Sequence, residues 1–145
     1  MKPRISISNL EPAAYKAMFG LETYLNTTGL NPVWKGLIKV RASQINGCAY
    51  CIEMHTREAR SAGESEQRLY ALSAWRGSPL FSDEERAILT VTEEVTQISN
   101  QGLSEETYQS ALDMLGEHAL ARIIMQIVTI NAWNRIAIST HMMHD

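Results

Sequence analysis

Helical periodicity runs through almost the whole chain and restricts its fold more than any other feature. Apolar residues recur at spacings of three and four, and few segments show the apolar–polar alternation of strands. The one β-rich stretch, residues 123–130, lies inside a longer helical pattern. The sequence therefore predicts an all-α bundle of six to seven helices, at residues 11–26, 31–44, 48–62, 65–75, 82–99, 104–115 and 117–140.

Local signals separate these helices by short connections. Asn31-Pro32 is typical of a helix start, with Asn as N-cap and Pro in the first turn. Ser82-Asp83-Glu84-Glu85 has the pattern of a capping box, and Asn46-Gly47 indicates a turn. We find no internal repeat and no long linker in the 145 residues. We therefore expect a single domain, residues 1–145.

The last predicted helix, residues 117–140, carries apolar residues around most of its circumference. A helix of this kind is buried on more than one side. Two interpretations remain open, a central core helix and a helix that also forms a subunit interface.

Composition excludes several classes of protein. Thirteen Lys and Arg against sixteen Asp and Glu give a net charge of −3, which lacks the basic footprint of a nucleic-acid-binding protein. No apolar run approaches the roughly 18 residues of a membrane span, and residues 1–6 lack the apolar core of a signal peptide. We expect a cytoplasmic protein with neither nucleic acid nor membrane as a partner. The two cysteines are too few for a disulfide scaffold.

The two cysteines, Cys48 and Cys51, stand at the predicted start of the third helix, followed by His55. At about 100° per residue all three share one helix face, and Cys51 and His55 are at the four-residue spacing of contacting side chains. A helix N-terminus stabilises a thiolate, and a histidine can accept the thiol proton. A second thiol can convert a sulfenic acid to a disulfide. The pattern predicts a redox-active dithiol.

Other interpretations of the CxxC pair compete with this one. A thioredoxin-like site needs a βαβ setting, which the helical pattern does not provide. A structural zinc site needs four ligands, whereas Cys48, Cys51 and His55 supply three. An inert buried pair also remains open, since a free cysteine is often a small core residue.

The segment Gln44–His55, continued by Thr56–Arg60, resembles the alkyl hydroperoxidase D-like branch of the carboxymuconolactone decarboxylase family. The resemblance extends through Gly63 and the helix at Glu85–Ala87 into Ile130–Arg135, so it covers most of the chain. It implies an all-helical bundle with the CxxC motif at the N-terminus of a central helix. It also implies a homo-oligomer, a trimer or hexamer.

The resemblance further implies a thiol-dependent peroxidase or disulfide reductase that needs no metal, haem or flavin. In such proteins the residue matching Cys51 attacks the hydroperoxide, and the residue matching Cys48 resolves the sulfenic acid. The histidine matching His55 activates Cys51 through a proton relay. A thiol or lipoyl-type partner recycles the disulfide.

Two positions depart from the pattern of the fully active members. A glutamate expected about a dozen residues before the first cysteine is Gly36 here, and a histidine between the cysteines is Tyr50. Glu93 or Glu94 of the fifth predicted helix could replace the glutamate, or could lie on a solvated helix face. The departures bear on the peroxidase rate more than on thiol reactivity.

Two functions compete with the peroxidase. One is a non-enzymatic redox-sensing or binding oligomer, in which the disulfide alters assembly. The other is a carboxymuconolactone decarboxylase, although that reaction has no evident need for a redox dithiol. The terminal His141-Met142-Met143-His144 segment resembles a soft-metal tract, but at a chain end we expect a frayed tail.

Overall fold

Helices account for all the regular structure in residues 1–144, the part of the chain that the computed structural model describes. In chain order they are α1 (Ile7–Leu10), α2 (Pro12–Thr27), α3 (Pro32–Asn46), α4 (Ala49–Ser61), α5 (Glu66–Ala71), the 3₁₀ helix η1 (Leu72–Gly77), α6 (Asp83–Thr96), α7 (Glu105–Leu115) and α8 (Glu117–Thr140). The predicted all-α fold is confirmed. The short helix α1 is additional, because four residues are too few to show a helical period.

Two predicted helices end differently from expectation. The helix expected at residues 65–75 is divided: α5 ends at Ala71 and the chain tightens into η1 at Leu72, and within η1 Ala74 leaves the helical region (φ −124°, ψ 32°). In a 3₁₀ helix side chains three residues apart lie on one side, so Leu72 and Trp75 are both buried. The helix expected to reach residue 99 ends at Thr96, because Gln97 adopts φ −95° and ψ 46°.

The predicted caps are confirmed. Asn31 Oδ1 accepts a hydrogen bond from the Val33 amide at 2.9 Å. Ser82 and Glu85 form the reciprocal bonds of a capping box, at 3.2 Å and 2.9 Å. Each bond satisfies an amide that the first turn of a helix leaves without an intrahelical acceptor.

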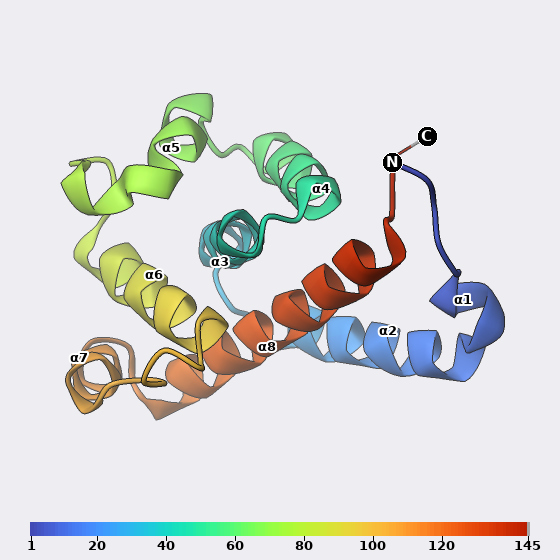
Figure 1. Cartoon of the computed structure of the whole chain (residues 1–145). Coiled ribbons are helices and arrows are strands. Elements are labelled where there is room, and N and C mark those ends of the chain that lie inside the picture. Colours follow the sequence, from blue (N-terminus) through green and yellow to red (C-terminus); the bar gives the residue numbers. More distant parts are fainter. Residues whose placement is uncertain (145) are drawn as a thin grey trace.

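Helix α3 lies at the centre of the bundle and packs against α4, α6 and α8 (Figure 1). One side of α3 belongs to a core cluster shared with α6, α7 and α8, made of Leu30, Ile38, Ala42, Ile88, Val91, Ala111, Leu120, Ile123, Ile127 and Ile130. The other side belongs to a cluster shared with α4, α5, η1 and α6, made of Leu37, Val40, Ala59, Leu69, Leu72, Trp75, Phe81 and Leu89. Burial on both sides holds the end of α3, and with it the turn that leads into α4.

Helix α8 forms part of the core and is also partly exposed. Ile123, Ile127 and Ile130 are buried, whereas Val128 and Ile138 are 44% and 43% exposed in the single chain. The core interpretation of this helix is therefore confirmed, and the subunit interface stays a prediction.

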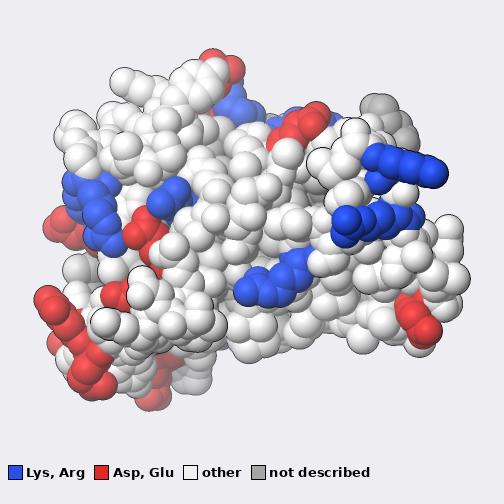
Figure 2. Space-filling model, in the orientation of Figure 1, with Lys and Arg blue, Asp and Glu red and all other residues white. Residues whose placement is uncertain are grey.

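The ends of the described chain lie close together. The Arg4 amide donates to the Thr140 carbonyl at 3.1 Å, so the N-terminal segment runs beside the end of α8 (Figure 1). Figure 2 shows charges of both signs toward the edges of one face, whereas the middle is largely uncharged apart from basic atoms near its centre. No helix within residues 1–144 is long and apolar enough to cross a membrane.

Candidate functional site

The two cysteines are placed by a tight turn between α3 and α4. Gly47 adopts a left-handed conformation with φ +69°, which glycine accommodates without strain, and the Cys48 amide donates to the Ser43 carbonyl at 3.0 Å. Cys48 is the N-cap of α4, and its Sγ accepts a hydrogen bond from the Cys51 amide at 3.3 Å. The predicted position of the CxxC motif at a helix start is confirmed.

Cys48 and Cys51 form a disulfide, with their Cα atoms 5.3 Å apart. Both side chains are buried, and they pack with Ala137 of α8 and with Tyr50 and Met142. The chain can therefore hold its dithiol in the oxidised form, packed against the end of α8.

A cavity of about 400 Å³ lies beside the disulfide, and we call it the redox cavity. Its volume is in the range that accommodates small organic ligands. Of the two cysteines, Cys51 lines this cavity and Cys48 does not. The redox cavity is lined by Tyr15, Phe19, Glu22, Asn26, Lys39, Tyr50, Cys51, Met54, His55, Glu58, Trp133, Ala137 and Met142.

His55 lines the same cavity, one helical turn after Cys51. It is 7% exposed, and its Nδ1 lies 2.8 Å from Glu58 Oε2. Burial lowers the pKa of His55 below its ordinary 6.5, and the charge of Lys39 lowers it further, although the hydrogen bond to Glu58 acts in the opposite direction. Nε2 is buried and has no hydrogen-bond partner within residues 1–144. At neutral pH the imidazole is therefore uncharged.

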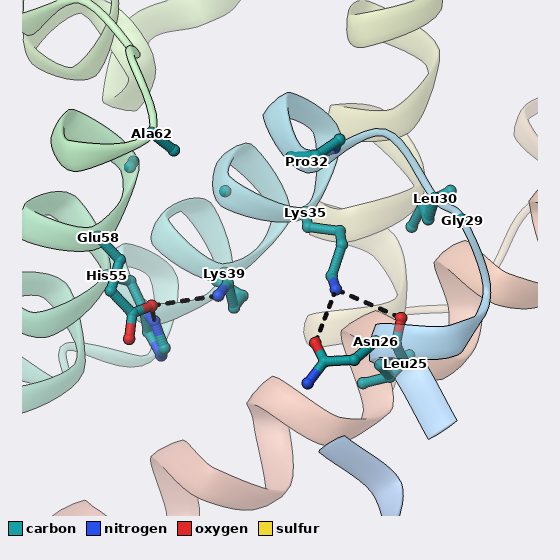
Figure 3. A pocket seen from close by; sticks show the side chains of 12 residues that line it. Leu25, Asn26, Gly29, Leu30, Pro32, Lys35, Lys39, His55, Glu58 and Ala62 are labelled. Carbon is teal, nitrogen blue, oxygen red and sulfur yellow. Dashed lines mark hydrogen bonds and ion pairs between the residues drawn. The ribbon is translucent and has the colours of Figure 1, made fainter. Parts of the chain in front are cut away.

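Glu58 is the carboxylate that bonds to His55. Burial raises the pKa of the Glu58 carboxyl, but the hydrogen bonds and charges of His55 and Lys39 outweigh it, and the net pKa is lowered. Glu58 is thus ionised and accepts a hydrogen bond from Nδ1–H, which leaves the Nε2 lone pair of His55 free. Lys39 Nζ lies 3.2 Å from the same oxygen, Oε2, and forms a continuous chain with Glu58 and His55 (Figure 3).

Glu58 and Lys39 were not among the site residues predicted from the sequence. Glu58 stands three residues after His55 on α4, a spacing at which helical side chains meet, so this signal was present. Lys39 comes from α3 and reaches the site only because α3 packs on α4. Gly36 bears no carboxylate, so in this chain the acidic partner of the histidine comes from α4 instead of α3.

Glu93 and Glu94 do not replace the missing glutamate, and neither lies on a merely solvated face. Glu93 accepts hydrogen bonds from Arg41, Trp75 and Arg76 at 3.1, 2.8 and 2.9 Å. Glu94 accepts the Ser104 amide at 3.0 Å and so anchors the start of α7. Both carboxylates stabilise helix packing away from the cysteines.

Aromatic side chains form much of the wall of the redox cavity. Tyr15, Phe19 and Trp133 pack edge to face or tilted, with ring centroids 5.2 to 5.7 Å apart. Trp133 Nε1 donates to Glu22 Oε1 at 2.9 Å, which ties α8 to α2 at this wall. Three helices that are distant in sequence, α2, α4 and α8, therefore enclose Cys51.

Residues 141–144 are not frayed, contrary to expectation. The His144 ring stacks on Tyr50, with centroids 4.2 Å apart. His144 Nε2 lies 2.9 Å from the Tyr50 carbonyl and 3.1 Å from Glu53. Tyr50, which stands where a relay histidine was expected, therefore holds His144 against the first turn of α4. Within residues 1–144, no group of three His, Cys, Asp or Glu side chains is placed to hold a metal ion.

The sequence of this chain is similar to those of known proteins. The sequence model of the carboxymuconolactone decarboxylase family matches residues 12–94, more than half of the chain. The Bacillus subtilis (strain 168) protein YdfG is 39% identical over 139 residues, which cover 96% of this chain and 95% of YdfG.

Solved structures show the same fold. A protein of Agrobacterium tumefaciens, proposed to be the antioxidant defence protein AhpD, superposes with a TM-score of 0.96 at 38% identity and covers 99% of both chains. The debrominase Bmp8 shares the fold alone, with a TM-score of 0.83 at 19% identity over 94% of this chain and 73% of its own. The chain belongs to the carboxymuconolactone decarboxylase family, in its alkyl hydroperoxidase D-like branch.

Proposed function

We propose that this protein is a thiol-dependent peroxidase and disulfide oxidoreductase that reduces organic hydroperoxides. The observation that carries the proposal is a disulfide-bonded Cys51 that faces the redox cavity together with a neutral His55 whose Nε2 is free. Such an arrangement combines a nucleophile with a base within one cavity.

The cycle starts from the dithiol. The Cys51 thiol transfers its proton to His55 Nε2, and Glu58 stabilises the resulting imidazolium through Nδ1. The thiolate attacks the terminal oxygen of the hydroperoxide, and the O–O bond breaks. Cys51 becomes a sulfenic acid, and the alkoxide leaves as an alcohol with the proton from His55. The sulfur is oxidised by two electrons, and the peroxide is reduced by two.

Cys48 resolves the sulfenic acid. Its sulfur attacks Cys51 Sγ, the S–O bond breaks, and hydroxide leaves as water with the Cys48 proton, which yields the disulfide. A dithiol reductant of lipoyl type then attacks Cys51 Sγ, because Cys51 lines the cavity. Cys48 leaves as a thiolate, stabilised by the Cys51 amide that already donates to its Sγ. The second thiol of the reductant then attacks the reductant's own sulfur in the resulting mixed disulfide, which releases Cys51 as a thiolate and leaves the reductant as an intramolecular disulfide; the two thiolates take up the two protons that the reductant thiols gave up.

The walls of the cavity support an organic hydroperoxide as the substrate. Phe19, Trp133 and Met54 offer apolar and aromatic surface to the organic group. We further propose that the protein acts as a cytoplasmic homo-oligomer, a trimer or hexamer. The exposed Val128 and Ile138 on α8 are candidate interface residues.

The test is consumption of cumene hydroperoxide with dihydrolipoamide as the reductant. We expect turnover by the wild-type protein, none by Cys51→Ser, and loss of activity through over-oxidation within a few cycles for Cys48→Ser. His55→Asn should slow the reaction, and the matched control His118→Asn, at an exposed position on α8, should not.

Equal rates for the wild-type protein and Cys51→Ser would refute the peroxidase. A change of oligomer size on oxidation, seen by light scattering without turnover, would instead identify a redox sensor. Conversion of γ-carboxymuconolactone by Cys51→Ser at the wild-type rate would identify a decarboxylase.

A further inference from the structure

A second cavity of about 420 Å³ adjoins the redox cavity, and the linked side chains of Lys39, Glu58 and His55 lie in its wall (Figure 3). We call it the lysine cavity, because Lys35 lies in its wall together with Gly36, between the end of α2, the start of α3 and the end of α4. It shares Asn26, Lys39, Glu58 and His55 with the redox cavity. A ligand bound in it would lie directly beside the base of the proposed redox site.

The two lysines of this cavity differ in the partners of their ammonium groups. Lys39 forms a salt bridge with Glu58 at 3.2 Å. The Lys35 ammonium donates to neutral acceptors, the Leu25 carbonyl at 3.3 Å and Asn26 Oδ1 at 3.4 Å. Lys35 forms no salt bridge within the described residues 1–144. One ammonium charge of the cavity therefore lacks an anionic partner.

The surroundings make this unpaired charge costly. Burial lowers the pKa of Lys35, and the positive charge of Lys39 lowers it further, although Glu22 acts in the opposite direction. A half-buried cation is stabilised when an anion approaches it. The cavity is thus set to favour a ligand that brings a negative charge.

Residue 36, beside Lys35 in the wall of the lysine cavity, is glycine. A Cβ at this position would only touch the Ala59 Cβ, at 3.6 Å, so the backbone neither is strained there nor requires the absence of a side chain. Leu25, Leu30, Pro32 and Ala62 form the apolar remainder of the wall. This combination suits an aliphatic chain that ends in one anionic group.

We propose that the lysine cavity binds a small aliphatic carboxylate, with its carboxylate against the Lys35 ammonium and its chain against the apolar wall. One ammonium without an anionic partner, next to an apolar wall, suits a monocarboxylate, whereas sites for phosphate use arginine forks or several backbone amides. The proposal does not rest on the peroxidase, because binding can be measured on the oxidised protein without any peroxide.

The experiment is a calorimetric titration of the oxidised protein with hexanoate, in parallel with NMR mapping of the amide shifts. Lys35→Gln removes the charge and keeps an amide that can still donate to the Leu25 carbonyl. We expect it to weaken hexanoate binding about tenfold, the effect of losing one charge-assisted contact. The matched control Lys16→Gln changes an exposed lysine on α2 and should leave the affinity unchanged.

Two further measurements make the test independent of the folding of Lys35→Gln. Gly36→Glu would place a carboxylate in the cavity, so it should abolish hexanoate binding while the protein stays folded by circular dichroism. Hexanol, which lacks the charge, should bind about tenfold more weakly than hexanoate. Equal binding of hexanol and hexanoate, unchanged binding by either variant, shifts confined to other surfaces, or no saturable binding would each overturn the proposal.

Discussion

Replacing Glu58 with glutamine tests the proposed role of His55 most directly. The change keeps the size of the side chain and an oxygen that can accept from Nδ1, but it removes the charge that stabilises the imidazolium. Glu58 Oε2 lies 2.8 Å from Nδ1. Because the carboxylate is 52% exposed, a water-like dielectric constant applies, and Coulomb's law gives about 1.5 kcal/mol. We therefore expect Cys51 to react with hydroperoxide about tenfold more slowly at neutral pH.

The measurement is the single-turnover rate of the pre-reduced protein with cumene hydroperoxide, followed by tryptophan fluorescence in a stopped-flow instrument. A single turnover excludes the reductant step, so the rate reports on Cys51 alone. The matched control is Glu66→Gln, since Glu66 has an exposed carboxylate on α5 that is paired with Arg60 at 3.7 Å. The hydrogen bond that His55 Nδ1 donates to Glu58 raises the pKa of His55, so the acid limb of Glu58→Gln should move to lower pH. A rate reduced by less than about twofold would refute the role of the carboxylate.

Three further predictions concern pH and stability. Since burial lowers the pKa of His55 below 6.5, the single-turnover rate should fall as the pH drops through that lowered value, and Lys39→Met should move this limb to higher pH by removing a nearby cation. Arg68→Met should lower the free energy of unfolding by about 3–5 kcal/mol, measured in urea at pH 7, because it leaves the buried Glu85 without its partner at 2.6 Å. Burial raises the pKa of Glu85, but the bonds from Arg68 and the capping box outweigh it, so the net pKa is lowered. The stabilisation is then complete above the unfolded value of 4.5 and is lost as the pH falls through the lower folded value, which the same urea series at acidic pH would show. Ile127→Ala in the core should cost about 2–5 kcal/mol by the same measurement, with little effect on peroxide reduction.

Much of the fold could be predicted because its signals are local. Some signals act within a few residues of the chain, such as the capping box Ser82–Glu85 and the turn glycine Gly47. Such signals can be recognised from the sequence alone. The division of the predicted helix at residues 65–75 could not be foreseen, because it follows from the need to bury Leu72 and Trp75 in a core made by other helices.

In the candidate site, too, the features that could be predicted are those that lie along a single helix. The predicted helix start and common face of Cys48, Cys51 and His55 follow from the spacing of residues on one helix, and the structure confirms that Cys48 caps α4 and that Cys51 and His55 share a cavity. Their catalytic roles stay predictions. Glu58 could have been found by the same argument.

By itself, the sequence determined what lies along single helices, namely the helical class, the caps and the placement of a dithiol and a histidine one turn apart. Only the tertiary structure decided what approaches this helix from elsewhere. Lys39 arrives from α3 and Trp133 from α8, and Glu93 is held by Arg41 away from the site. The physical reason is that helix periodicity acts over about four residues, whereas the cavities are shaped by the packing of helices far apart in the chain.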